Sequence, residues 1–90
     1  MTGKIKELPL EFDGKGEVSE YRFRQLKKTD KAYMYEKTCD EGSTSYEVFK
    51  RKINRRFQSV SYPKSNSFGL WAWDIRDYER ALECFNELSK

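Results

Sequence analysis

Ninety residues supply one hydrophobic core, which excludes a second domain within this sequence. Hydrophobic and charged residues each make up 37% of the chain, a polar composition that is still too rich in apolar side chains for a disordered protein. The formal net charge of +3 is too small to indicate a nucleic-acid partner unless it is unevenly distributed, and the absence of histidine excludes imidazole-based catalysis and the commonest neutral metal ligand.

Residues 1–16 read MTGKIKELPLEFDGKG and are expected to form an N-terminal arm, followed by a single α+β domain over residues 17–90. Leu8, Leu10 and Phe12 alternate, so the arm can dock along a sheet, where Pro9 would restrict it to an edge. The start of the chain has no apolar core typical of a signal peptide, and no apolar run approaches the ~20 residues that cross a bilayer. We therefore expect a cytoplasmic protein without a membrane-spanning segment.

Three strands are predicted in the first half of the domain. Residues 17–28 alternate, with Tyr21 and Phe23 on one side of the strand and arginines on the other. A polar turn and a second β-rich stretch over residues 32–38 complete a hairpin. A third strand over residues 45–53 follows the turn around Gly42, and its apolar residues on both sides indicate either a central strand or a sheet whose second face the arm covers.

Residues 54–67 do not hold one hydrophobic period and predict either a long loop or a weak hairpin. Residues 68–75 predict the last strand, with Trp71 and Trp73 on one face and Ala72 on the other. If the helix covers the indoles, they belong to the core. If it does not, Trp71 and Trp73 form a partner surface, because exposed tryptophans favour association.

The final segment predicts an amphipathic helix capped by Asp74 or Asp77. Its apolar residues recur at the three-and-four spacing of one helical face: Tyr78, Ala81, Leu82, Phe85 and Leu88. Because a helix this short is marginal alone, its apolar face must be buried. The predicted fold is α+β, an antiparallel sheet of about four strands with one C-terminal helix packed on one face, in ββββα order.

No combination of residues indicates catalysis. Cys39 and Cys84 lack metal-ligand spacing and are expected to be free thiols, with a disulfide between them as the alternative. The neighbouring acids, Asp40 with Glu41 and Asp74 with Asp77, stand where turn and cap residues belong. We expect a non-catalytic binding module with no catalytic residues, metal or cofactor.

The stretch 46–62 mixes dense positive charge with aromatic residues, and no acidic residue lies between Lys50 and Lys64. Lysine and arginine neutralise phosphates, while aromatic rings stack on unpaired bases, so this mixture favours single-stranded nucleic acid. The alternatives are a solvated strand face and a surface for an acidic protein partner. The predicted nucleic-acid-binding residues are Lys50, Arg51, Lys52, Arg55, Arg56, Phe57, Tyr62 and Lys64.

In the order of its elements, strands followed by one C-terminal helix, the stretch 17–88 resembles the small single-stranded-DNA-binding coactivator fold. That resemblance implies a curved sheet, a helix and a homodimer, and it transfers no functional residue. The alternative function is a protein-interaction or inhibitor module that forms a homodimer. Its small size, basic loop and lack of catalytic groups also resemble accessory proteins of phages and mobile elements.

Overall fold

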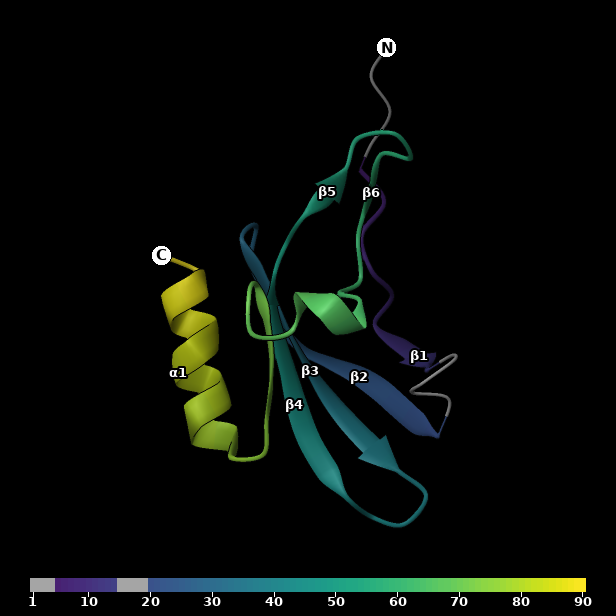
Figure 1. Cartoon of the computed structure of the whole chain (residues 1–90), viewed down its shortest axis with the longest axis vertical. Coiled ribbons are helices and arrows are strands. Elements are labelled where there is room, and N and C mark those ends of the chain that lie inside the picture. Colours follow the sequence, from purple (N-terminus) through teal and green to yellow (C-terminus); the bar gives the residue numbers. More distant parts are fainter. Residues whose placement is uncertain (1–4, 15–19) are drawn as a thin grey trace.

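The computed structural model describes residues 5–14 and 20–90. It contains an antiparallel sheet of five strands in the order β1-β2-β3-β4-β7, followed by one C-terminal helix (Figure 1). This confirms the α+β fold class. The fifth strand is β1, an edge strand that lies within the segment expected to be an arm. The strands of the sheet are β1 (Glu11–Asp13), β2 (Tyr21–Lys28), β3 (Ala32–Cys39), β4 (Thr44–Lys50) and β7 (Ala72–Ile75).

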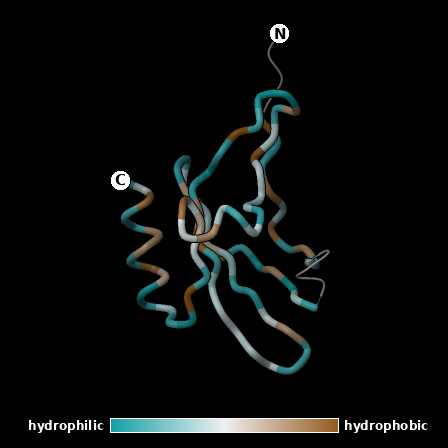
Figure 2. Tube along the Cα trace, viewed as in Figure 1, coloured by the Kyte–Doolittle hydropathy of each residue, from teal (hydrophilic) through white to brown (hydrophobic). Residues whose placement is uncertain are grey.

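The helix α1 (Tyr78–Leu88) covers one face of the sheet. Asp77 is its N-cap, because its side chain accepts a hydrogen bond of 3.3 Å from the backbone amide of Arg80. Hydropathy alternates along the coil of α1 (Figure 2), and the buried residues Ala81 and Phe85 pack against strands β3 and β4. The helix thus begins directly after an acidic N-cap, two residues beyond the end of β7, and its apolar side packs on the sheet.

The opposite face of the sheet, here called the aromatic face, is built around the buried residues Phe23, Tyr33, Tyr35 and Phe49. The rings of Tyr35 and Phe49 stack with centroids 5.9 Å apart. Side chains from residues 5–12 and 60–71 cover this face. Because both faces are covered, residues 32–35 of β3 are all fully buried, which explains a strand without polar alternation.

Beyond β4 the chain forms a small hairpin that projects from the sheet (Figure 1). Its strands are β5 (Ile53–Asn54) and β6 (Ser59–Val60), so the hairpin alternative is confirmed over the long loop. The Asn54 side chain accepts hydrogen bonds from the backbone amides of Arg56 and Phe57, at 3.0 and 3.4 Å. Gln58 completes the turn with φ at 50°, a left-handed conformation that is uncommon for a residue other than glycine.

The predicted strand over residues 68–75 is only half as long as expected. A short 3-10 helix, η2 (Ser65–Ser67), and a turn at Gly69, with φ at 92°, precede β7. Trp71 consequently packs against the aromatic face, whereas Trp73 lies opposite Val48 and therefore on the helix side of the sheet. The expectation that both indoles share one strand face is wrong, because residues 69–71 form a turn.

Candidate nucleic-acid interface

Five of the eight residues predicted to bind nucleic acid lie on the hairpin and the chain leading to it. They are Lys50, Lys52, Arg55, Arg56 and Phe57, all of them exposed. We call residues 50–58 the basic hairpin. Lys64 is also exposed, but it stands before η2 and outside the hairpin. The other two, Arg51 and Tyr62, are directed into the body of the domain.

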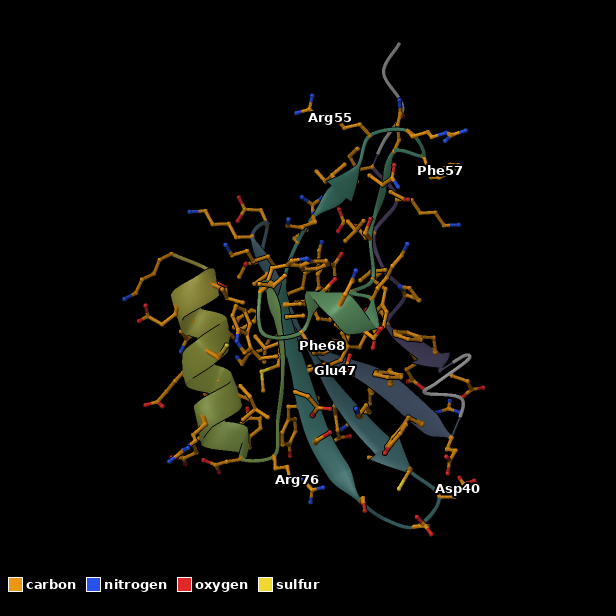
Figure 3. The ribbon with its side chains drawn as sticks, in the orientation of Figure 1. Asp40, Glu47, Arg55, Phe57, Phe68 and Arg76 are labelled. Carbon is orange, nitrogen blue, oxygen red and sulfur yellow. The ribbon has the colours of Figure 1, made fainter. Side chains whose placement is uncertain are left out.

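The tip of the basic hairpin combines positive charge with an exposed ring. Figure 3 shows Arg55 and Phe57 projecting from the turn, away from the sheet. Phe57 is 69% exposed, and the guanidinium carbon of Arg56 lies 5.5 Å from its ring centroid. An exposed phenyl ring gains nothing from folding, so its position at the tip suits a partner with a flat apolar face.

The cations of the basic hairpin have no acidic neighbour along the chain, since no Asp or Glu occurs between Glu47 and Asp74. Within the described ranges, Lys50, Lys52, Arg55 and Arg56 form no ion pair. Some cations elsewhere are matched by carboxylates, as in the pairs of Arg22 with Glu11 and Asp13. The positive field of the hairpin is therefore not cancelled locally.

Arg51 differs from its neighbours because it is bound to Glu7. Its Nε donates to the Glu7 carboxylate at 3.0 Å, and Nη2 makes a second, shorter contact. These hydrogen bonds lower the pKa of Glu7 from 4.5 to about 2, helped by the hydroxyl of Tyr33 and the charge of Lys28. Arg51 thus anchors residues 5–12 to the sheet. The other cations of the basic hairpin remain exposed.

Tyr62 is half-buried and contributes to the core. Its ring packs edge-on against Phe23 and Phe49, with centroids 5.7 and 5.6 Å apart. Its hydroxyl donates to the carboxylate of Glu47, a residue that is 1% exposed. Burial and the charge of Glu47 raise the pKa of Tyr62. Sequence reasoning missed this role because Tyr62 stands beside cationic residues.

Lys6 joins the basic hairpin from the N-terminal segment. Its backbone amide donates to the carbonyl of Gln58 at 2.8 Å, and its carbonyl accepts from Val60 at 2.9 Å, so residue 6 lies beside β6. The exposed Lys6 side chain adds a cation to the hairpin. No local sequence signal predicts this pairing, because it joins segments more than fifty residues apart.

The indoles of Trp71 and Trp73 are both half-buried but occupy different surroundings. The ammonium of Lys52 lies over the ring of Trp71, 5.1 Å from its centroid. Trp71 therefore borders the basic hairpin at its base, and Trp73 does not share that surface. Only one of the two residues predicted as a partner surface lies next to the cations.

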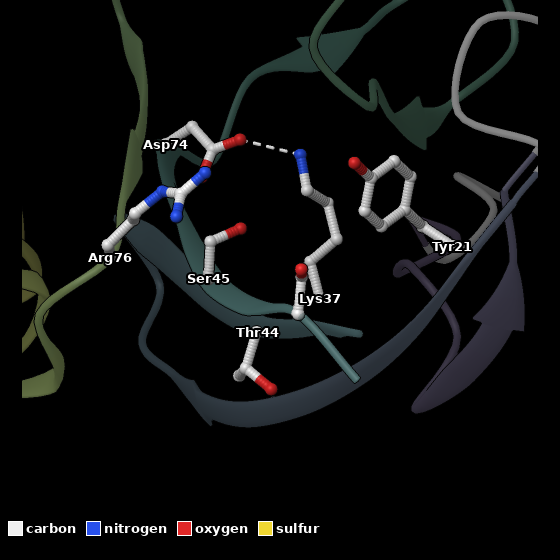
Figure 4. Close-up of a pocket in the computed structure, with 7 residues that line it drawn as sticks. Tyr21, Lys37, Thr44, Ser45, Asp74 and Arg76 are labelled. Atoms are coloured by element: carbon white, nitrogen blue, oxygen red, sulfur yellow. Dashed lines mark hydrogen bonds and ion pairs between the residues drawn. The ribbon is translucent and has the colours of Figure 1, made fainter. Parts of the chain in front are cut away.

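A polar pocket of about 330 Å³ opens at the end of the sheet near the β3–β4 turn (Figure 4). It is lined by Tyr21, Lys37, Ser43, Thr44, Ser45, Asp74 and Arg76. The ammonium of Lys37 donates to Asp74 at 2.5 Å and to the buried Glu47 at 3.3 Å. Because two carboxylates already hold this ammonium, Lys37 serves to compensate a buried charge and is not a free cation.

The pKa values around this pocket reflect both burial and the neighbouring charges. Burial raises the pKa of Glu47, against the opposing effects of the Tyr62 hydroxyl and Lys37. Burial also acts to lower the pKa of Lys37, but Asp74 and Glu47 outweigh it and the pKa is raised. The cluster is a network of two carboxylates around one ammonium, and Lys37 is charged at neutral pH.

The two thiols, at Cys39 and Cys84, are free. In the described part of the chain, Cys, Asp and Glu side chains gather nowhere in a group of three that could hold a metal ion. No helix in residues 5–14 and 20–90 has the length and apolar character needed to cross a membrane.

Comparison of the sequence with protein-family models, and of the protein with curated proteins and solved structures, finds no match.

Proposed function

We propose that this protein binds single-stranded nucleic acid through the basic hairpin. One observation carries the proposal: four exposed cations and an exposed phenyl ring share one projecting hairpin, and no acidic side chain occurs in that segment. Cations supply phosphate contacts, and the ring of Phe57 offers a stacking surface that any base can use. Duplex DNA hides its bases from such a ring, so single strands are the favoured class.

Fluorescence anisotropy of a labelled oligonucleotide of about 12 nucleotides tests the proposal, beginning at about 50 mM salt. We expect binding that weakens as salt rises, with a log–log slope of about −3 if four phosphates are neutralised. The double substitution R55A/R56A is expected to reduce the magnitude of that slope by about 1.4, and F57A to weaken binding about tenfold.

The control variant K27A/R80A removes two exposed cations from β2 and α1, outside the hairpin. It has the same net charge as R55A/R56A and is expected to bind like the unaltered protein. Absence of binding at low salt contradicts the proposal, and so does equal weakening by the two double variants, since that would reflect net charge alone.

An acidic protein segment is the other partner that the hairpin charge would suit. Polyglutamate used as a competitor separates the two, because it supplies carboxylates without bases. If polyglutamate displaces the labelled oligonucleotide as effectively as unlabelled oligonucleotide, and F57A has no effect, the acidic-partner alternative replaces the proposal.

A further inference from the structure

We infer that Trp71 is a second base-stacking platform, and that a bound single strand runs along β5 between Trp71 and Phe57. The inference rests on the proposed function and deepens it, since it gives the bound strand a path along the site. It begins from a repeated arrangement. At each end of β5 a cation lies over an aromatic ring, with Lys52 on Trp71 at 5.1 Å and Arg56 on Phe57 at 5.5 Å.

The position of Trp71 is held by its backbone. Its carbonyl accepts from the amide of Lys50 at 3.0 Å, and its own amide donates to Ser67 at 3.1 Å. The indole is half-buried and packs against the aromatic face, while the preceding Leu70 is 73% exposed. The ring is therefore held beside Lys52 at the base of the hairpin, and little conformational freedom is lost when a base stacks on it.

Cations and rings share the path from the base of the hairpin to its tip. Trp71 borders the base of the hairpin and Phe57 stands at its tip, and Lys52 and Arg55 belong to the segment that runs from base to tip, where they can meet the phosphates of a strand stacked on both rings. An ammonium that rests on an indole in the free protein can move to a neighbouring phosphate when a base takes its place. Indole offers a larger stacking surface than the phenyl ring at the tip.

Two platforms, one at the tip of the hairpin and one beside its base, act as linked sites. Once a strand stacks on one ring, the other ring meets the next bases at a high effective concentration, so a strand that spans both binds more tightly than one that reaches only one. The affinity should therefore rise steeply with oligonucleotide length. Loss of either ring should remove most of this length dependence.

Intrinsic fluorescence tests the inference, because the protein has only two tryptophans. In the variant W73F, Trp71 is the sole emitter, and an oligonucleotide of about 12 nucleotides is expected to quench it strongly. In W71F the remaining Trp73, on the helix side, is expected to respond weakly. W71L keeps an apolar side chain in place and is expected to weaken binding about tenfold, and its circular dichroism checks that the fold persists.

Affinities for oligonucleotides of about 4 and about 12 nucleotides are then compared, because only the longer strand can reach both rings. We expect the unaltered protein to prefer the longer strand markedly, and W71L and F57A each to lose most of that preference. Binding by anisotropy without quenching in W73F, or with no length preference, overturns the Trp71 platform and leaves the proposed function standing. No binding of either oligonucleotide overturns both.

Discussion

Glu7 and Arg51, 44 residues apart in the sequence, form an ion pair that joins the N-terminal segment to the base of the basic hairpin. The pair has two consequences. It takes Arg51 out of the group of exposed cations, and it holds residues 5–12 over the aromatic face. One contact thus removes a cation from the exposed group and helps to hold the cover of the sheet.

The Glu7–Arg51 pair predicts a specific acid sensitivity. The pKa of Glu7 is about 2 in the folded protein against an ordinary 4.5, so its contribution is complete above pH 4.5 and is lost as the pH falls toward 2. Because the Glu7 side chain is 34% exposed, we expect a contribution on the order of 1 kcal/mol. Urea denaturation at a series of pH values measures it.

The variant E7Q should lose this part of the pH dependence while keeping the hydrogen-bonding shape of the side chain. Its free energy of unfolding is expected to lie below that of the unaltered protein at pH 6 and to approach it near pH 2. Parallel curves for the two proteins across this range would show that the ion pair does not stabilise the fold.

The buried pair of Lys37 and Glu47 predicts a double-mutant result. K37M leaves the Glu47 carboxylate buried without its cation and is expected to cost about 3 kcal/mol in the free energy of unfolding at pH 7. The double variant K37M/E47Q removes the uncompensated charge and should recover most of that loss. Chemical denaturation checks both, and a double variant as unstable as K37M would contradict the charge argument.

The left-handed backbone at Gln58 predicts which substitutions the hairpin tolerates. Q58G suits a φ of 50° and is expected to preserve the turn, whereas a β-branched valine is strongly disfavoured there and should open it. Limited tryptic cleavage after Arg55 and Arg56 reports on the turn. We expect Q58V to be cut several-fold faster than Q58G, and equal rates would mean that the turn geometry does not limit access.

The N-cap of α1 predicts a modest loss of stability. D77A removes the side chain that accepts from the Arg80 amide and is expected to cost about 1 kcal/mol, or about 4–8 °C in Tm for a chain of this size. D77N keeps an accepting oxygen and should lose only part of this. Thermal denaturation followed at 222 nm measures the difference, and an unchanged Tm for D77A would show that the cap contributes nothing.

Local pattern was sufficient for much of this fold. The helix was predicted over the residues that form it, and the β2–β3–β4 meander follows from alternation and turns, because both depend on neighbours within a few positions. The apolar residues on both sides of β4 correctly indicated a central, doubly covered strand. The dense charge of residues 50–56 was likewise visible without a structure.

Contacts between distant segments settled the rest. Whether a cation of the basic segment is exposed or paired depends on Glu7, and whether Tyr62 meets a base or the core depends on Glu47, partners that no local period reveals. The separation of Trp71 from Trp73 follows from a turn at Gly69 that interrupts an apparently continuous strand. Composition marks where charge and aromatic rings are abundant, whereas long-range packing selects which of them face outward.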